Sequence, residues 1–178
     1  MEREEAIKKL KRLVGKNLHD LAIKFDVTVV TKNKKVNKGW AGHVCERYLN
    51  LPINSSQSPD FGNWELKSIP LKYKKNNQLT FKETMAITMI DPVNVKKNDF
   101  ENSHLLTKLK KFVCVARTVG KDFSEPTYIR DVVAFDLKGE IYQSVKEDYD
   151  IVRECLLDNK RGFEKLTGKM GKFIQPRT

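Results

Sequence analysis

The sequence predicts an α/β domain in which a central sheet is flanked by helices, because apolar residues recur with two different periods. Residues 3–26 and 38–49 show the spacing of amphipathic helices. Residues 64–71 and 112–119 instead have the composition of strands that are apolar on both faces. At 178 residues the chain can form a real hydrophobic core. We expect one domain over residues 1–178, or the catalytic portion of a longer protein.

The predicted helices each carry an apolar stripe. Residues 3–26 should form two helices broken near Gly15, and both stripes are core-forming. In residues 38–49 the stripe is Trp40, Val44 and Tyr48, while Glu46 falls on another side, one turn after Gly42. A late helix should begin with Ser144 as its cap. Its stripe consists of Val145, Tyr149, Val152 and Leu156.

The strand predicted at residues 64–71 carries the candidate chemistry. Side chains two residues apart share a face of a strand, so Glu65 and Lys67 should stand side by side, with Asp60 in the turn before them. Carboxylates next to a lysine suit metal-assisted phosphodiester cleavage, since hard oxygens bind magnesium and a cation can act on the attacking water. The alternative is a solvated charge ladder, because 32% of the chain is charged. Apolar neighbours on both faces favour an interior strand, where an unpaired carboxylate is costly.

Further strands follow the candidate site. A hairpin-like connection with lysines, among them Lys72, leads to a second strand predicted at 81–90. Asn102 or Ser103 should cap a short helix that ends near Lys110. A buried strand is expected at 112–119 and another at 127–137.

Composition narrows the functional class. The net charge of +11 and the pI of about 9.5 indicate a polyanionic partner, with nucleic acid, membranes and heparin-like polymers as the alternatives. No apolar run has the length of a membrane span, so we expect a cytoplasmic protein without membrane contact. The three widely separated cysteines indicate reduced thiols. The histidines are scattered, which argues against a zinc site. The sequence has no glycine-rich phosphate loop, which argues against nucleotide hydrolysis.

Two basic segments are candidate contacts to a phosphate backbone. The first is T-K-N-K-K-V-N-K at 31–38, which includes Lys34, Lys35 and Lys38 and leads into the helix with Glu46. The second, at 160–172, is rich in glycine and includes Lys169. Either segment could instead be a solvated connector.

Several short segments of the sequence resemble segments of one known family, and they occur in the same order along the chain. The active-site region of the MutH mismatch-repair endonucleases and their GATC-cutting restriction-enzyme relatives is similar to three of them, K-G-W-A-G-H-V-C-E, S-P-D and W-E-L-K-S-I-P. These enzymes belong to the P-D-(D/E)-x-K nuclease superfamily. The predicted opening helices also resemble those of the family. Three later segments resemble family segments as well, namely S-H-L-L-T-K-L-K-K-F-V, K-E-D-Y-D-I-V-R-E and G-K-F-I-Q-P-R-T. The resemblance covers nearly all the chain and implies a restriction-endonuclease-like mixed sheet.

The resemblance also implies roles for individual residues. The family's metal-binding carboxylates fall on Asp60 and Glu65, with the Leu66 backbone carbonyl as a further ligand for magnesium, and its catalytic lysine falls on Lys67. Its helix glutamate falls on Glu46 and a later lysine on Lys108. The lysine that opens the glutamate-bearing helix falls on Lys38, and Arg177 lies in the segment leading to the DNA-reading region.

Three departures accompany the resemblance. The connection between Asp60 and Glu65 is shorter than in the mismatch-repair enzymes, and the chain stops at Thr178, before the position of their carboxy-terminal arm. Gln175 also stands where that family has an arginine.

We therefore expect a magnesium-dependent endonuclease acting on double-stranded DNA. The first expectation is a type II restriction enzyme, or its catalytic domain, that cleaves unmethylated GATC. The alternatives are a mismatch-repair nicking enzyme activated by a MutL-like partner, and a DNA-binding module without catalysis. The sequence is compatible with both a monomer and a dimer.

Overall fold

A computed structural model describes the chain except for residues 52–61, 121, 123–124, 159–161 and 178. It divides into two compact units. Unit 1 comprises Met1–Ala86 and Phe112–Phe135, and unit 2 comprises Ile87–Lys111 and Asp136–Thr178. The expectation of a single domain remains a prediction.

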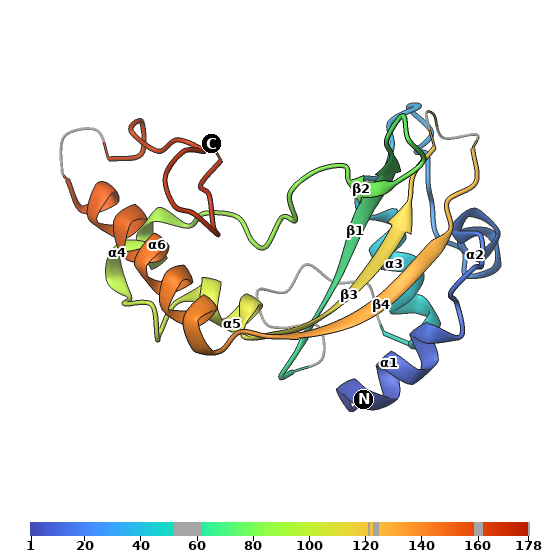
Figure 1. Cartoon of the computed structure of the whole chain (residues 1–178), viewed down its shortest axis with the longest axis horizontal. Coiled ribbons are helices and arrows are strands. Elements are labelled where there is room, and N and C mark those ends of the chain that lie inside the picture. Colours follow the sequence, from blue (N-terminus) through green and yellow to red (C-terminus); the bar gives the residue numbers. More distant parts are fainter. Residues whose placement is uncertain (52–61, 121, 123–124, 159–161, 178) are drawn as a thin grey trace. The chain divides into compact units, whose positions relative to one another are not determined.

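Unit 1 is built on a mixed sheet. Within the described residues its strands are β1 (Glu65–Tyr73), β2 (Leu79–Phe81), β3 (Lys111–Thr118) and β4 (Ile129–Asp136), in the order β2-β1-β3-β4 (Figure 1). β1 pairs with β2 as an antiparallel hairpin and with β3 in parallel. This arrangement confirms both the predicted mixed sheet and the interior position of the strand with Glu65 and Lys67.

The parallel register assigns side chains to the two faces of the sheet. Glu65 is paired with Phe112 and Lys67 with Cys114, whereas Leu66 is paired with Val113. Because successive side chains of a strand alternate between faces, Glu65 and Lys67 share one face and Leu66 lies on the other. The Leu66 face carries the core.

Three helices supply the apolar side chains that cover the Leu66 face. They are α1 (Arg3–Lys11), α2 (Leu18–Lys24) and α3 (Trp40–Tyr48) (Figure 1). Gly15 lies between α1 and α2 with φ +79°, a left-handed conformation that glycine adopts without a steric penalty, so the predicted break is confirmed. The core that results includes Leu10, Leu18, Trp40, Val44, Trp64, Leu66, Val113, Val115 and Ile129.

One predicted strand, which would run from unit 1 into the first residues of unit 2, is wrong. We expected a strand over 81–90, but β2 ends at Phe81 and residues 84–91 have no regular structure. Thr84, Ala86 and Met89 are exposed, the last by 88%. Strand propensity expresses packing against neighbouring strands and a half-buried surface. This segment has no strand partner in the described sheet, so its composition alone does not make it a strand.

The described residues of unit 2 form three helices. They are α4 (Pro92–Lys97), α5 (His104–Leu109) and α6 (Gly139–Leu157). The Ser103 hydroxyl accepts a hydrogen bond from the Leu106 N–H at 3.0 Å, which confirms Ser103 as the cap of α5. The buried side of α6 packs Val152 and Leu156 against Leu166, with Ile90, Val95 and Met170 around them.

The predicted start of α6 is wrong. The helix begins at Gly139, so Ser144 lies within its second turn instead of capping it. Lys138 occupies the cap position without a side-chain hydrogen bond, and Gly139 has φ +62°. The predicted stripe of Val145, Tyr149, Val152 and Leu156 is nevertheless buried. In the part of the chain that the structure describes, no helix is long and apolar enough to cross a membrane.

Candidate active site

The centre of the candidate site is an ion pair on β1. The Lys67 Nζ donates a hydrogen bond to Glu65 Oε1 at 2.8 Å. The Glu65 side chain is only 5% exposed and that of Lys67 17%. A carboxylate is buried at large cost unless a charge or a metal compensates it, and Lys67 supplies a compensating charge. The predicted side-by-side placement is therefore confirmed, and the solvated ladder is excluded for Glu65.

The helix α3 carries Glu46 above a glycine. A Cβ atom added at Gly42 would lie 3.8 Å from Glu46 Oε1, so the glutamate side chain extends over Gly42, as the spacing predicted. Glu46 is half-buried, and the next residue toward the amino terminus is the fully buried Cys45. Burial, with the Glu46 charge as a smaller cause, raises the pKa of the Cys45 thiol to about 12.

The donor atoms of a metal site are described only in part. Asp60 lies outside the described residues, and among those that are described no three His, Cys, Asp or Glu residues cluster around a common point. The described part of the expected set is the buried Glu65 carboxylate and the Leu66 backbone carbonyl. Both are hard oxygen donors, which fits magnesium in type.

The side chains of Arg117, Trp40 and His19 form a layer on the core face of β1. The Arg117 guanidinium, on β3, donates from Nε to the Ser68 hydroxyl at 3.1 Å and lies 5.7 Å from the centre of the Trp40 ring. His19 stacks on the same indole at 4.8 Å. Burial lowers the pKa of both Arg117 and His19. Sequence analysis missed this layer, although an arginine inside an apolar strand is a signal that could have found it.

The basic segment at 31–38 is a defined turn. Val30 pairs with Val36, and the Thr31 N–H donates to the Lys35 carbonyl at 2.8 Å. Lys34 has φ +58°, in the left-handed region. The side chains of Lys34, Lys35 and Lys38 are exposed. The turn thus presents lysines next to the start of α3, and their contact with phosphates stays a prediction.

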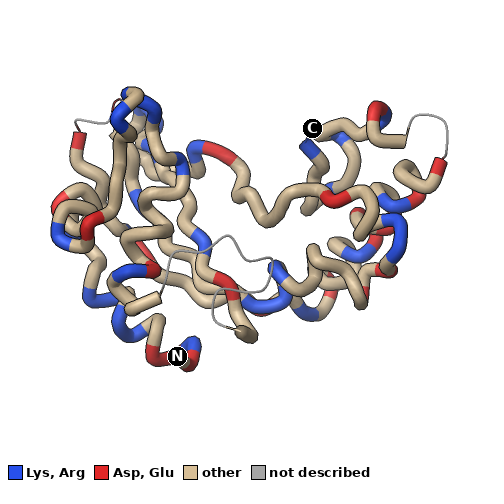
Figure 2. The backbone as a smooth tube through the Cα atoms, turned by 180° about the vertical axis from the view of Figure 1, so that it is seen from behind, with Lys and Arg blue, Asp and Glu red and all other residues tan. Residues whose placement is uncertain are grey.

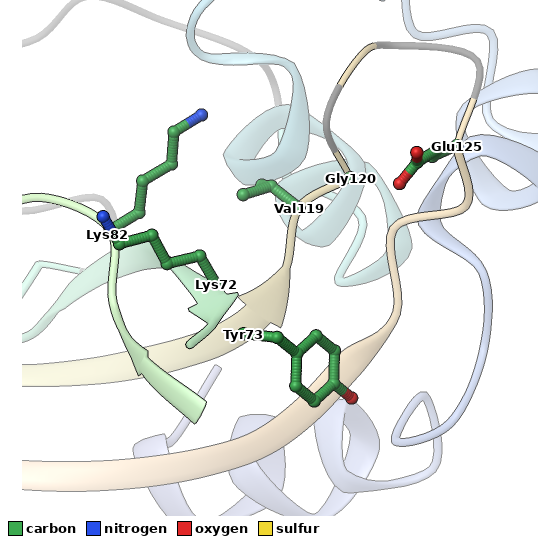
Figure 3. A pocket seen from close by; sticks show the side chains of 6 residues that line it. All are labelled: Lys72, Tyr73, Lys82, Val119, Gly120 and Glu125. Carbon is green, nitrogen blue, oxygen red and sulfur yellow. The ribbon is translucent and has the colours of Figure 1, made fainter. Parts of the chain in front are cut away.

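A pocket lies at the end of the β1–β2 hairpin. Lys72, Tyr73 and Lys82 line it together with Val119, Gly120 and Glu125. Figure 3 shows the two lysine side chains along one side, with Glu125 on the other. The Tyr73 hydroxyl is held by a hydrogen bond of 2.8 Å from Arg130. Lys72, a predicted DNA contact, is therefore exposed at a surface that gathers several cationic groups.

The remaining predicted residues belong to unit 2. Lys108, on α5, is buried with 7% exposure, whereas Lys169 and Arg177 are exposed on the irregular segment after α6. Basic positions occur along both units (Figure 2). The structure thus brings Glu65 and Lys67 together within unit 1. That Lys108 lies near this pair stays a prediction.

Comparison with known proteins connects this geometry to a family. The family model described as "DNA mismatch repair enzyme MutH" matches residues 49–148, more than half of the chain. The DNA mismatch repair protein MutH of Vibrio campbellii is 27% identical, over 97% of this chain and 75% of its own length. That of Haemophilus ducreyi is 24% identical with the same coverage.

A restriction enzyme is among the relatives as well. The type II restriction enzyme Sau3AI of Staphylococcus aureus is 24% identical over 81% of this chain, but over only 30% of its own length. The matched region of the family model contains β1 with its buried Glu65–Lys67 pair and α5 with Lys108. The chain belongs to the MutH family of endonucleases.

Proposed function

We propose that this chain is a magnesium-dependent, sequence-specific endonuclease that cleaves double-stranded DNA at unmethylated GATC, the target that the sequence resemblance implies. The observation that carries the proposal is the Glu65–Lys67 pair, buried on an interior strand and joined at 2.8 Å. A chain that served only to bind DNA would have no need for a buried carboxylate beside a lysine. Exposed cations alone would suffice for that purpose.

The pair divides two tasks between its members. Lys67 holds its ammonium at the Glu65 carboxylate, where it can orient the attacking water and assist its deprotonation. Glu65, Asp60 and the Leu66 carbonyl would hold magnesium. When bound, the ion would polarise the scissile phosphate and stabilise the departing oxyanion. The Glu65 carboxylate would thus compensate two positive charges, the Lys67 ammonium and the metal ion.

Glu46 and Lys108 have supporting roles in this proposal. Glu46 extends from α3 over Gly42, and its carboxylate would complete the shell of the metal or of the attacking water. Lys108 is a buried cation on α5, and it would act as a catalytic neighbour that contacts the reacting phosphate. Both roles follow from the family positions on which the sequence resemblance places these residues.

The exposed cations would bind the DNA backbone. These residues are Lys34, Lys35, Lys38, Lys72, Lys169 and Arg177, all of them exposed. Phosphate contacts of this kind position a protein on DNA and make its affinity depend on salt, but they carry no sequence information. The net charge of +11 agrees with such a partner.

A second candidate function is a repair enzyme that nicks one strand and is activated by a MutL-like protein. Coverage favours it, because the chain matches 75% of the length of two mismatch repair relatives and only 30% of the restriction enzyme. A restriction enzyme should cut both strands on its own, most simply as a dimer. A repair enzyme should nick as a monomer and respond to its partner.

Cleavage of plasmid DNA tests both candidates. The purified chain is incubated with supercoiled plasmid, with and without magnesium, on GATC-methylated and unmethylated substrate. We expect magnesium-dependent cutting at unmethylated GATC, which Glu65→Gln abolishes and the exposed-site control Glu5→Gln does not. Linear product indicates the restriction function, and nicked product that increases with a MutL-like protein indicates the repair function. Binding without cutting in every arm would refute the nuclease proposal.

A further inference from the structure

The helix α6 carries a buried carboxylate that organises a distant piece of backbone. Asp148 is only 5% exposed, and it accepts three hydrogen bonds from consecutive N–H groups. The Lys172 N–H donates to Oδ1 at 2.8 Å, whereas those of Phe173 and Ile174 donate to Oδ2 at 2.6 and 3.0 Å. Successive N–H groups that converge in this way form an anion-binding nest, and here the anion is the protein's own side chain.

The position of Asp148 in the sequence agrees with this role. It follows Val145 by three residues, and so falls on the apolar stripe of α6. A charge on the buried side of a helix needs strong partners, and three charge-assisted hydrogen bonds supply them. Sequence analysis missed Asp148, although a carboxylate within an apolar stripe is the signal that could have found it.

Gly171 permits the close approach of this segment. Its φ is +79°, and an added Cβ would lie 2.1 Å from the Ile174 carbonyl oxygen and 3.0 Å from the Asp148 Cγ. Any other residue would force the turn apart. Met170 packs against the apolar cluster of unit 2, and Pro176 is buried. The backbone between them is therefore held at both ends and in the middle.

The held segment directs polar and cationic side chains outward. Lys172, Gln175 and Arg177 are exposed, and the Lys172 ammonium lies 5.5 Å from the ring centre of Phe173, itself 50% exposed. Lysine and arginine contact phosphates, and glutamine and arginine can read base edges through paired hydrogen bonds. These residue types fit double-stranded DNA better than an apolar or acidic partner.

We propose that Asp148 is a positioning residue for DNA recognition, whose carboxylate holds residues 172–174 in the one conformation that presents Lys172, Gln175 and Arg177 to the target. This inference rests on the proposed endonuclease function. A segment that is ordered before binding loses less conformational entropy when the target arrives, so it favours the sequence that matches its preset geometry. DNA without the target sequence gains less from that order, since it is bound mainly through phosphates.

The first test compares Asp148→Asn with Asp150→Asn in the full chain. Both variants lose one carboxylate of α6, but Asp150 is partly exposed and pairs only with Lys146 at 2.7 Å among its described contacts. In Asp148→Asn we expect the amides of residues 172–174 to exchange hydrogen about tenfold faster or more, because the amide NH₂ cannot accept their bonds. Asp150→Asn should leave their exchange unchanged. Equal exchange in both variants would overturn the proposed anchoring.

The second test measures recognition without requiring cleavage. Affinities are determined for one duplex that contains GATC and for one that lacks it. We expect the ratio of the two affinities to fall about tenfold in Asp148→Asn, with affinity for the duplex lacking GATC kept within about twofold. A preserved ratio together with faster exchange would refute the recognition role. If the wild-type protein does not distinguish the duplexes, the GATC proposal itself has failed. The hydrogen-exchange result then still decides whether Asp148 anchors residues 172–174.

A double-mutant cycle separates positioning from general stability. Gln175→Ala changes an exposed side chain and should lower the affinity ratio by itself. If Asp148 acts through the segment, Gln175→Ala should have little further effect in the Asp148→Asn background. Additive losses would instead indicate two independent effects. Should Asp148→Asn fail to fold, Gly171→Ala distorts the same turn with the carboxylate intact, and the same cycle with Gln175→Ala is then decisive.

Discussion

Replacing Lys67 by alanine is the most direct perturbation of the candidate site. At the observed 2.8 Å, and with an effective dielectric constant of about 20, the attraction between the two charges is about 6 kcal/mol. Most of this offsets the desolvation of two largely buried groups. Leaving Glu65 without Lys67 should therefore lower the unfolding free energy by about 1–3 kcal/mol. We expect a value near the lower limit of this range, because the Lys67 side chain keeps 17% exposure and water can partly solvate the site.

The effect of Lys67→Ala on cleavage should be far larger than its effect on binding. Removing a group that orients and helps deprotonate water costs about 10²–10⁴-fold in rate. DNA affinity should stay within about threefold, because positioning depends on other lysines. Single-turnover cleavage with protein in excess gives the rate, and anisotropy of labelled DNA gives the affinity.

A matched control for the same experiment is Lys9→Ala. Lys9 also pairs with a glutamate, Glu5 at 2.7 Å, but on the exposed surface of α1. It should change neither the denaturation midpoint nor cleavage measurably. The catalytic assignment of Lys67 would be refuted if Lys67→Ala lost binding while each bound complex still cleaved at the wild-type rate.

Three further predictions concern other parts of unit 1. Replacing Lys34 and Lys35 by alanine should weaken DNA binding and flatten the slope of log affinity against log salt by about two, and an unchanged slope would remove that turn from the interface. Glu46→Gln should reduce cleavage by about tenfold or more and raise the magnesium concentration needed. If Glu46 is merely a surface residue, magnesium titrations of the variant and wild type will coincide. Burial raises the pKa of Cys45 to about 12 and that of Cys114 to about 11, so both thiols should resist alkylation at pH 8 until the protein unfolds. Rapid alkylation of the native protein, followed by mass spectrometry, would contradict the burial of the two thiols. Because the thiols ionise at lower pH in the unfolded chain than in the folded one, the unfolding free energy should also fall as pH rises above about 8.5.

The part of the site on β1 could be predicted from sequence because its determinants are local. Alternation places Glu65 and Lys67 on one face whatever the rest of the fold does. Apolar neighbours on both faces indicated an interior strand, and the structure confirms this with β2 and β3 on either side. The helix with Glu46 was similarly predictable, because one apolar stripe fixes which side of a helix is free.

The failures occur where partners distant in sequence decide the outcome. The segment 81–90 has strand composition, but a strand exists only where a neighbour pairs with it, and pairing ends at Phe81. Ser144 has the chemistry of a cap, yet α6 starts at Gly139, because interior serines are tolerated in a helix stabilised by its buried stripe. The three bonds of Asp148 join residues 24 to 26 positions apart, beyond the reach of local patterns.

The two tryptophans of the chain make the division into units measurable. Trp40 and Trp64 are both buried in the core of unit 1, and the sequence of unit 2 contains no tryptophan. Indole fluorescence during denaturation therefore reports on unit 1 alone. Circular dichroism receives its largest single helical contribution from the 19 residues of α6, the longest helix among those described. Coincident transitions from the two signals would show that the units unfold as one cooperative body, and separated transitions would measure how weakly each depends on the other.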